Sequence, residues 1–145
     1  MNSIAENLYN EKIYVDTSAW FALLYQGDKH HQRISKLYDL LLNNNNVLYT
    51  SNMIVGETFT LMRYRITGQS TAALYYLRII KSSLRINKIN VDEDIEDMAV
   101  DILEKYREHK FSYVDASSFA VMEKYNLKYA LTLDNHFSIA GFSII

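Results

Sequence analysis

Four acidic residues stand beside predicted strands in a chain that contains no cysteine. Asp16 directly follows an apolar run at 13–15, and Asp134 comes at the end of another at 129–133. Asp115 opens a predicted helix, and Glu57 lies about one turn inside the helix that follows a second short strand. Carboxylate oxygens without thiolates or a histidine cluster select hard cations. These residues therefore predict a site for Mg²⁺ or Mn²⁺.

A carboxylate site of this kind suits hydrolysis of a phosphodiester bond. One or two divalent ions would lower the pKa of a water, align it for in-line attack and neutralise charge on the leaving oxygen. The chain offers no motif for a protein nucleophile, which fits attack by water. Asp16 and Asp115 could instead cap helix N-termini, and the other two acids could be ordinary turn and helix-surface residues. Four close anions would, however, need cations at neutral pH.

Short apolar runs alternate with helical patterns along the chain. Strands are expected at 13–15, 47–50, 86–91, 129–133 and 142–145. This alternation predicts an α/β fold in which right-handed crossovers form a central, mainly parallel sheet flanked by helices. Because ligands bind beyond the carboxyl ends of such strands, we expect the four acids to meet at that edge.

Length and composition fit one domain. The 145 residues are 49% hydrophobic and 22% charged. The longest apolar run, at 19–25, is too short to cross a bilayer, and the first residues carry no basic and apolar leader pattern. We therefore expect a cytoplasmic protein that does not enter a membrane.

The small net charge of −2 conceals two blocks of opposite sign. Residues 58–91 contain bases and no acid, whereas residues 92–108 are strongly acidic. A phosphate backbone could bind the basic block, and the alternative is a salt-bridged surface facing the acidic block. The helical pattern predicts that three of these bases share one face, with two more on the preceding helix: Arg78, Lys81 and Arg85, then Arg63 and Arg65.

Four sequence strings, in their order and intervals, resemble those of PIN-domain proteins, and specifically the VapC-type ribonuclease toxins of toxin–antitoxin pairs. They read IYVDTSAW, MIVGET, FSYVDASSFAV and LTLDNHF. The resemblance covers residues 13–145 and leaves 1–12 as a short N-terminal extension. It implies an α/β/α sandwich whose acidic pocket binds Mg²⁺ or Mn²⁺ and cleaves RNA endonucleolytically.

The resemblance also implies roles for individual residues. The family's catalytic and metal-binding acids match Asp16, Glu57, Asp115 and Asp134. Ser18 matches a small hydroxyl residue that hydrogen-bonds inside the pocket, and Thr132 is expected to orient the fourth acid. His136 lies near the pocket, where we favour a phosphate contact over a metal contact. His30 and His31 are interpreted as residues of a solvated segment.

Proteins of this type usually form homodimers and are inhibited by a small antitoxin, so both partners are expected here. A haloacid-dehalogenase-like phosphatase would need a second aspartate where Ser18 stands, and a receiver domain would need paired acids and a late lysine. Two alternatives stay open. One is a non-catalytic RNA- or protein-binding module whose acids hold a structural cation, and the other is a housekeeping RNA-processing PIN nuclease.

Overall fold

A parallel sheet forms the centre of the computed structural model, which describes residues 3–66, 68 and 70–145. In this part of the chain the sheet has five strands in the order β3-β2-β1-β4-β5, and every pairing is parallel. The strands are β1 Lys12–Val15, β2 Val47–Ser51, β3 Ile86–Ile89, β4 Tyr129–Leu131 and β5 Ser143–Ile144. The predicted α/β class with a parallel sheet is confirmed.

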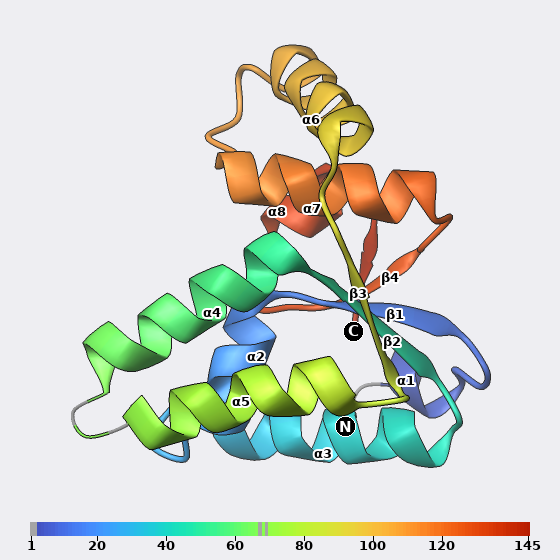
Figure 1. The fold of residues 1–145 in the computed structure, drawn as a ribbon. Helices are drawn as coiled ribbons and strands as arrows, with labels where there is room; N and C mark the ends of the chain where they lie inside the picture. The colour runs from blue at the N-terminus through green and yellow to red at the C-terminus, as the bar shows by residue number, and fades with distance from the viewer. Residues whose placement is uncertain (1–2, 67, 69) are drawn as a thin grey trace.

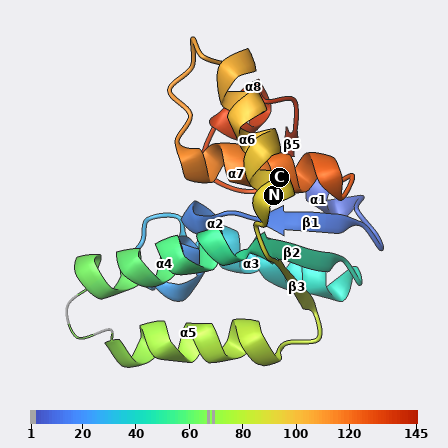
Figure 2. The ribbon, with the colours of Figure 1, turned by 45° about the horizontal axis from the view of Figure 1, so that its top comes forward.

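Helices cover both faces of the sheet. They are α1 Ser3–Glu6, α2 Thr17–Leu24, α3 His31–Asn43, α4 Asn52–Arg65, α5 Ser70–Ser82, α6 Glu93–Lys105, α7 Tyr113–Lys124 and α8 His136–Ile139. Figures 1 and 2 show α6, α7 and α8 on one side of the sheet and α2, α3, α4 and α5 on the other. None of the described helices combines the length and apolar character needed to cross a membrane.

The central strand β1 is apolar throughout its buried length because helices pack on both of its faces. Ile13, Tyr14 and Val15 are each at most 1% exposed. The Tyr14 hydroxyl donates a hydrogen bond of 2.8 Å to Ser118 Oγ on α7, which satisfies a buried polar group. Burial raises the pKa of the Tyr14 phenol far above its ordinary value, so this hydroxyl keeps its proton.

The chain order of the strands creates the crevice that the site requires. From β1 the chain passes first to β2 on one side of the sheet, and later to β4 on the other. The connections therefore diverge beyond the carboxyl end of β1, which is where open parallel sheets bind ligands. Asp16 is the first residue after β1 and stands at this point.

The N-terminal segment before β1 packs against the rest of the domain. Ala5 and Leu8 are buried in the main core. The fully buried Asn46 ties this segment to the start of β2, because its side chain accepts a hydrogen bond from Glu11 N at 2.8 Å and donates one to Leu8 O at 3.1 Å. The division into an extension at 1–12 and a domain at 13–145 stays a prediction.

Helix α5 differs from its predicted form. The helical pattern in the sequence predicts an apolar side made of Leu74, Leu77, Ile80 and Leu84. Ile80 is buried and Leu77 packs against the core, but Leu74 and Leu84 are 50% and 99% exposed, and Ala73 and Tyr76 are buried beside Ile80. The helix ends at Ser82 because the chain must extend to pair β3 with β2, so the expectation that Arg85 shares a helical face with Arg78 and Lys81 is wrong.

Candidate active site

A pocket of about 310 Å³ lies at the carboxyl edge of the sheet. The four predicted acids all line it: Asp16, Glu57, Asp115 and Asp134. They come from the end of β1, from α4, from α7 and from the loop after β4. Folding thus brings together side chains that are far apart in sequence, as the strand pattern predicted.

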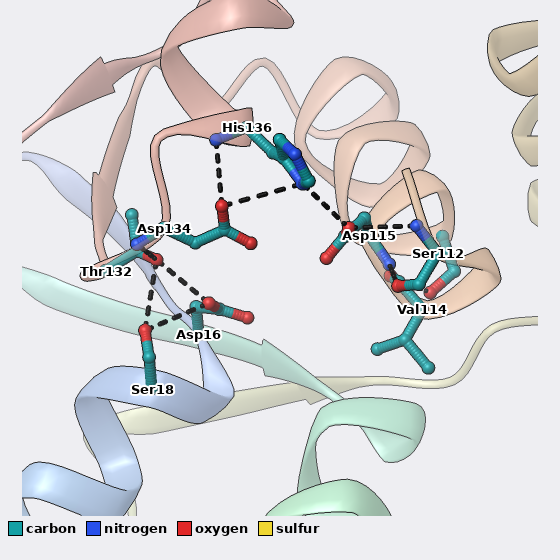
Figure 3. Close-up of polar contacts among 9 residues, drawn as sticks. Asp16, Ser18, Ser112, Val114, Asp115, Thr132, Asp134 and His136 are labelled. Carbon is teal, nitrogen blue, oxygen red and sulfur yellow. Dashed lines mark hydrogen bonds and ion pairs between the residues drawn. The ribbon is translucent and has the colours of Figure 1, made fainter. Parts of the chain in front are cut away.

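Asp16 is the most buried of the four acids, with 6% of its surface exposed. Its carboxylate Oδ2 accepts hydrogen bonds from Thr132 Oγ1 at 2.8 Å and from Ser18 Oγ at 3.2 Å (Figure 3). Asp16 occupies the N-cap position of α2, but its side chain makes no capping hydrogen bond. The strong hydrogen bonds of its carboxylate therefore go to the two hydroxyls of the pocket, which weakens the interpretation of Asp16 as a helix cap alone.

Burial raises the pKa of Asp16 from its ordinary value of 3.8 to about 6. The loss of solvation is the largest cause, and the hydrogen bonds from Thr132 and Ser18 offset part of it. The negative charge of nearby Asp115 adds to the increase. Ionising Asp16 is thus costly in the protein alone, and a cation placed beside its carboxylate would remove much of that cost.

Ser18 and Thr132 connect Asp16 to the loop that carries Asp134. Ser18 Oγ accepts a hydrogen bond of 2.9 Å from Leu133 N, and Thr132 Oγ1 accepts one of 3.0 Å from Asp134 N. The two hydroxyls lie 3.2 Å apart. Thr132 therefore contacts the backbone of the fourth acid, as expected, and also binds the first acid directly.

Asp115 is held by the start of α7. Ser112, rather than Asp115, is the N-cap, so the helix begins earlier than predicted and the N-cap interpretation of Asp115 is wrong. The two residues form a capping box, in which Asp115 N donates to Ser112 Oγ and Ser112 N donates to Asp115 Oδ2, each at 2.9 Å. These bonds fix the rotamer of Asp115 and point its carboxylate into the pocket (Figure 3).

His136 bridges two of the acids, and the sequence interpretation gave it too little weight. Its Nδ1 lies 3.3 Å from Asp115 Oδ2 and 3.6 Å from Asp134 Oδ1. Its backbone N also donates to Asp134 Oδ1 at 2.9 Å. One ligand atom from each of these three residues lies within 4.8 Å of the others. The sequence does contain a signal for this role, because His136 comes two residues after Asp134, at the end of a predicted strand.

Two further residues complete the pocket. Glu57 is half-buried and lines it from α4, whose N-cap Ser51 accepts a hydrogen bond from Ile54 N at 3.1 Å. Thr17 also lines the pocket, and its buried hydroxyl has no hydrogen-bond partner among the described residues. An unpartnered buried hydroxyl costs about 1–3 kcal/mol. Sequence reasoning missed Thr17, although it directly follows Asp16.

The donor set fits a hard divalent cation. Five acidic residues line the pocket, the four predicted ones and Asp28; Asp16 is destabilised by burial, and an imidazole lies beside two of the others. Oxygen-rich sites of this composition suit hard divalent cations. The acidic cluster predicted from the sequence is therefore present.

The predicted basic surface divides into residues with different contacts. Arg65 lines the acidic pocket. Arg63 lies over the Phe59 ring, 5.9 Å from its centroid. Arg85 donates to the backbone carbonyls of Leu42 and Asn46 at 3.2 and 3.0 Å. Among the residues whose positions are described, no ion pair joins the basic block to the acidic block at 92–108, so the salt-bridge interpretation is not supported.

Comparison with known proteins identifies the family of this chain. The PIN domain family model matches residues 13–143, so the chain belongs to the PIN-domain family of nucleases. The 23S rRNA-specific endonuclease VapC20 of Mycobacterium tuberculosis H37Rv is 37% identical over 130 residues, which are 90% of this chain and 95% of that protein.

Solved structures give the same result. The crystal structure of M. tuberculosis VapC20, described as a sarcin-ricin loop cleaving toxin, matches with a TM-score of 0.80 and 38% identity over 90% of this chain and 95% of that one. VapBC2 from Rickettsia felis, bound to a promoter DNA fragment, matches with a TM-score of 0.69 and 14% identity over 92% and 97% of the two chains. FitAcB from Neisseria gonorrhoeae matches with a TM-score of 0.66 and 19% identity, and the match covers 92% of this chain and 96% of that one. The last two show the fold alone.

Proposed function

We propose that this protein is a metal-dependent endoribonuclease and the toxin of a toxin–antitoxin pair. The observation that carries the proposal is the meeting of four carboxylates in one pocket at the switch point of the sheet. The similarity to an endonuclease toxin over 90% of the chain supports it.

The acids Asp16, Glu57, Asp115 and Asp134 would hold Mg²⁺ or Mn²⁺. When bound, the ion would supply Lewis-acid stabilisation of the charge that develops on the phosphate during hydrolysis.

The other pocket residues fix the positions of these acids. Ser18 and Thr132 hold the Asp16 carboxylate by two hydrogen bonds. Ser112 holds Asp115 at the start of α7. His136 contacts Asp115 and the neighbouring acid at the same time, which keeps two carboxylates at a constant separation. Such fixed positions reduce the reorganisation needed when substrate binds.

RNA is the proposed substrate, and a fragment of 23S rRNA that contains the sarcin-ricin loop is the first RNA to test. This choice rests on the relative's described specificity. Exposed bases outside the pocket would bind the RNA backbone, which predicts affinity that falls steeply with salt. The candidates are Arg63, Arg78 and Lys81, with Arg65 inside the pocket; Arg85 is excluded because backbone carbonyls already occupy its guanidinium.

An antitoxin partner, a homodimer and a cytoplasmic location are parts of the same proposal. The relative VapC20 is described as a toxin, and this supports a protein partner that inhibits the chain. Size-exclusion chromatography of the chain, alone and co-expressed with the protein encoded beside it, tests both assemblies. Elution as a lone monomer in both samples would contradict them.

A cleavage assay in Mn²⁺ tests the proposed activity. Wild-type protein should cut the 23S rRNA fragment, whereas Asp16→Asn and Asp115→Asn should each lose at least about 100-fold in rate, since even partners of metal ligands contribute 10- to 100-fold. Asp97→Asn, on the outer side of α6, is the matched control and should keep full activity. Cleavage that survives both pocket substitutions would refute the proposed site.

A further inference from the structure

One face of α4 continues the acidic pocket away from the carboxylates. Glu57, Leu61 and Arg65 are spaced four residues apart, so they lie above one another on the helix, and all three line the pocket. Eight residues of helix separate the first from the last, which is roughly 12 Å along the axis. The pocket therefore extends along α4 from the predicted metal ligands to a cation.

Arg65 is available to bind a ligand. Among the described residues it is the one base that lines the pocket, and no carboxylate lies within ion-pair distance of its guanidinium. It also makes no hydrogen bond or ring contact there, unlike Arg63 on Phe59 or Arg85 on two carbonyls. A planar guanidinium of this kind suits bidentate binding of a phosphate.

An aromatic side chain lies opposite this face. Phe21 on α2 is half-buried and lines the same pocket, and α2 packs beside α4. The Tyr25 ring supports Phe21, with centroids 5.7 Å apart and planes tilted by 59°. Gly27 makes room for Tyr25, since a Cβ there would come within 2.5 Å of its ring. Phe21 thus lines the pocket from α2 while its ring packs on Tyr25 at the end of that helix.

We propose that Phe21, Leu61 and Arg65 form a subsite for one unpaired nucleotide of the RNA strand, adjacent to the phosphodiester bond that is cut. The base stacks on Phe21 against Leu61, and Arg65 binds the neighbouring phosphate. This inference rests on the proposed nuclease function and adds to it a place where the substrate strand is recognised.

The chemistry favours a nucleotide over a peptide. The subsite combines an aromatic face with an unpaired guanidinium, the pair of groups with which proteins bind splayed single-stranded bases and their phosphates. It is also continuous with the carboxylates where the linkage would be cut. Stacking tolerates every base, so the subsite requires an unpaired nucleotide and selects sequence only weakly.

Binding measured apart from cleavage tests the subsite. Fluorescence anisotropy follows a 5′-labelled ten-nucleotide RNA binding to the Asp115→Asn protein in Mn²⁺, so that the RNA stays intact. Adding Phe21→Ala should weaken binding about 5- to 150-fold, and Phe21→Trp should keep most of the affinity. Adding Arg65→Gln should reduce the slope of log affinity against log salt by about 0.7, and Arg65→Lys should restore part of it.

Matched controls lie on other surfaces. Arg33→Gln removes an exposed cation from α3, and Tyr9→Ala removes an aromatic ring that is 61% exposed before β1. Both should bind the RNA like the parent protein. Thermal unfolding of every variant shows whether it is folded, and Phe21→Trp keeps the test valid if Phe21→Ala does not fold.

The outcomes separate this inference from the proposed function. If the wild-type protein cleaves RNA but Phe21→Ala and Arg65→Gln bind with unchanged affinity and salt slope, the subsite is refuted and the nuclease stands. If those variants lose a protein partner and bind RNA normally, the surface belongs to a peptide and the inference is wrong. If the wild-type protein does not cleave RNA and the Asp115→Asn protein does not bind it, both proposals fail.

Discussion

Substitution of Asp16 by asparagine should stabilise the metal-free protein. Burial raises the pKa of Asp16 from 3.8 to about 6, so its ionised form costs the folded state about 3 kcal/mol at neutral pH. Asparagine has no charge to desolvate, and its Oδ1 can still accept the hydrogen bonds from Thr132 and Ser18. For a chain of 145 residues, this corresponds to an increase of about 10 °C in melting temperature.

The direction of the pH dependence follows from the same pKa. Because the folded pKa lies above the unfolded one, folded Asp16 holds its proton where the unfolded chain has already lost it. The wild-type protein therefore loses stability as pH rises from about 4 to about 6, relative to Asp16→Asn. Below about pH 4 the two proteins should be equally stable, and above about pH 6 the difference should stay constant.

Thermal and urea unfolding in EDTA, from pH 3.5 to 8, measures this difference. Saturating Mn²⁺ should then reverse the order, since an ion at about 1,000 times its dissociation constant adds about 4.1 kcal/mol to the wild-type protein and little to the variant. Asp97→Asn serves as the control for removing an exposed acid. Equal stability of wild type and Asp16→Asn in EDTA at every pH would refute the reasoning.

Three further substitutions test the packing around the site. Asn46→Ala should destabilise the protein by about 2 kcal/mol in urea unfolding, because it leaves buried backbone groups of the N-terminal segment unpaired. The N-terminal segment should also be cleaved faster by a protease. Arg85→Ala should lower stability by about 1 kcal/mol without changing RNA affinity, which a combined melting and anisotropy measurement checks. Ser112→Ala should cost about 1 kcal/mol because it removes the cap of α7, and it should leave Mn²⁺ affinity in calorimetry nearly unchanged, because the Ser112 backbone N that holds the Asp115 carboxylate is kept; a large loss of affinity would contradict this reasoning.

The strands and the four acids could be predicted because their signals are local. A buried parallel strand is a short continuous apolar run, as at Ile13, Tyr14 and Val15, and the residue that follows it necessarily lies at the ligand-binding edge. Asp16 and Asp134 were therefore placed correctly from sequence position alone. The order of the strands in the sheet then brings the four acids close together.

The course of α5 could not be predicted, because two faces of this segment carry apolar residues at helical spacing. Leu74, Leu77 and Ile80 recur at helical spacing, and so do Ala73, Tyr76 and Ile80, and only packing against the neighbouring elements buries the second set most deeply. The helix end at Ser82 depends on pairing between β3 and β2, which no local pattern contains. For the same reason, Arg85 does not share a helical face with Arg78 and Lys81.

The partners of the pocket residues were also beyond a sequence interpretation. The role of His136 depends on the loop after β4 turning toward the start of α7, which brings its imidazole between two carboxylates (Figure 3). Ser112 was missed as an N-cap because Asp115 is itself a good capping residue in the same turn. The position of His136 and the N-cap at Ser112 both depend on tertiary contacts and not on residue type.

Anomalous scattering from a crystal soaked in Mn²⁺ tests the central claim most directly. We expect one or two strong anomalous peaks within coordination distance of the four carboxylates, those of Asp16, Glu57, Asp115 and Asp134. These peaks should disappear in Asp16→Asn crystals treated in the same way. A pocket that stays free of anomalous signal while the wild-type protein is folded and saturated with Mn²⁺ would contradict it.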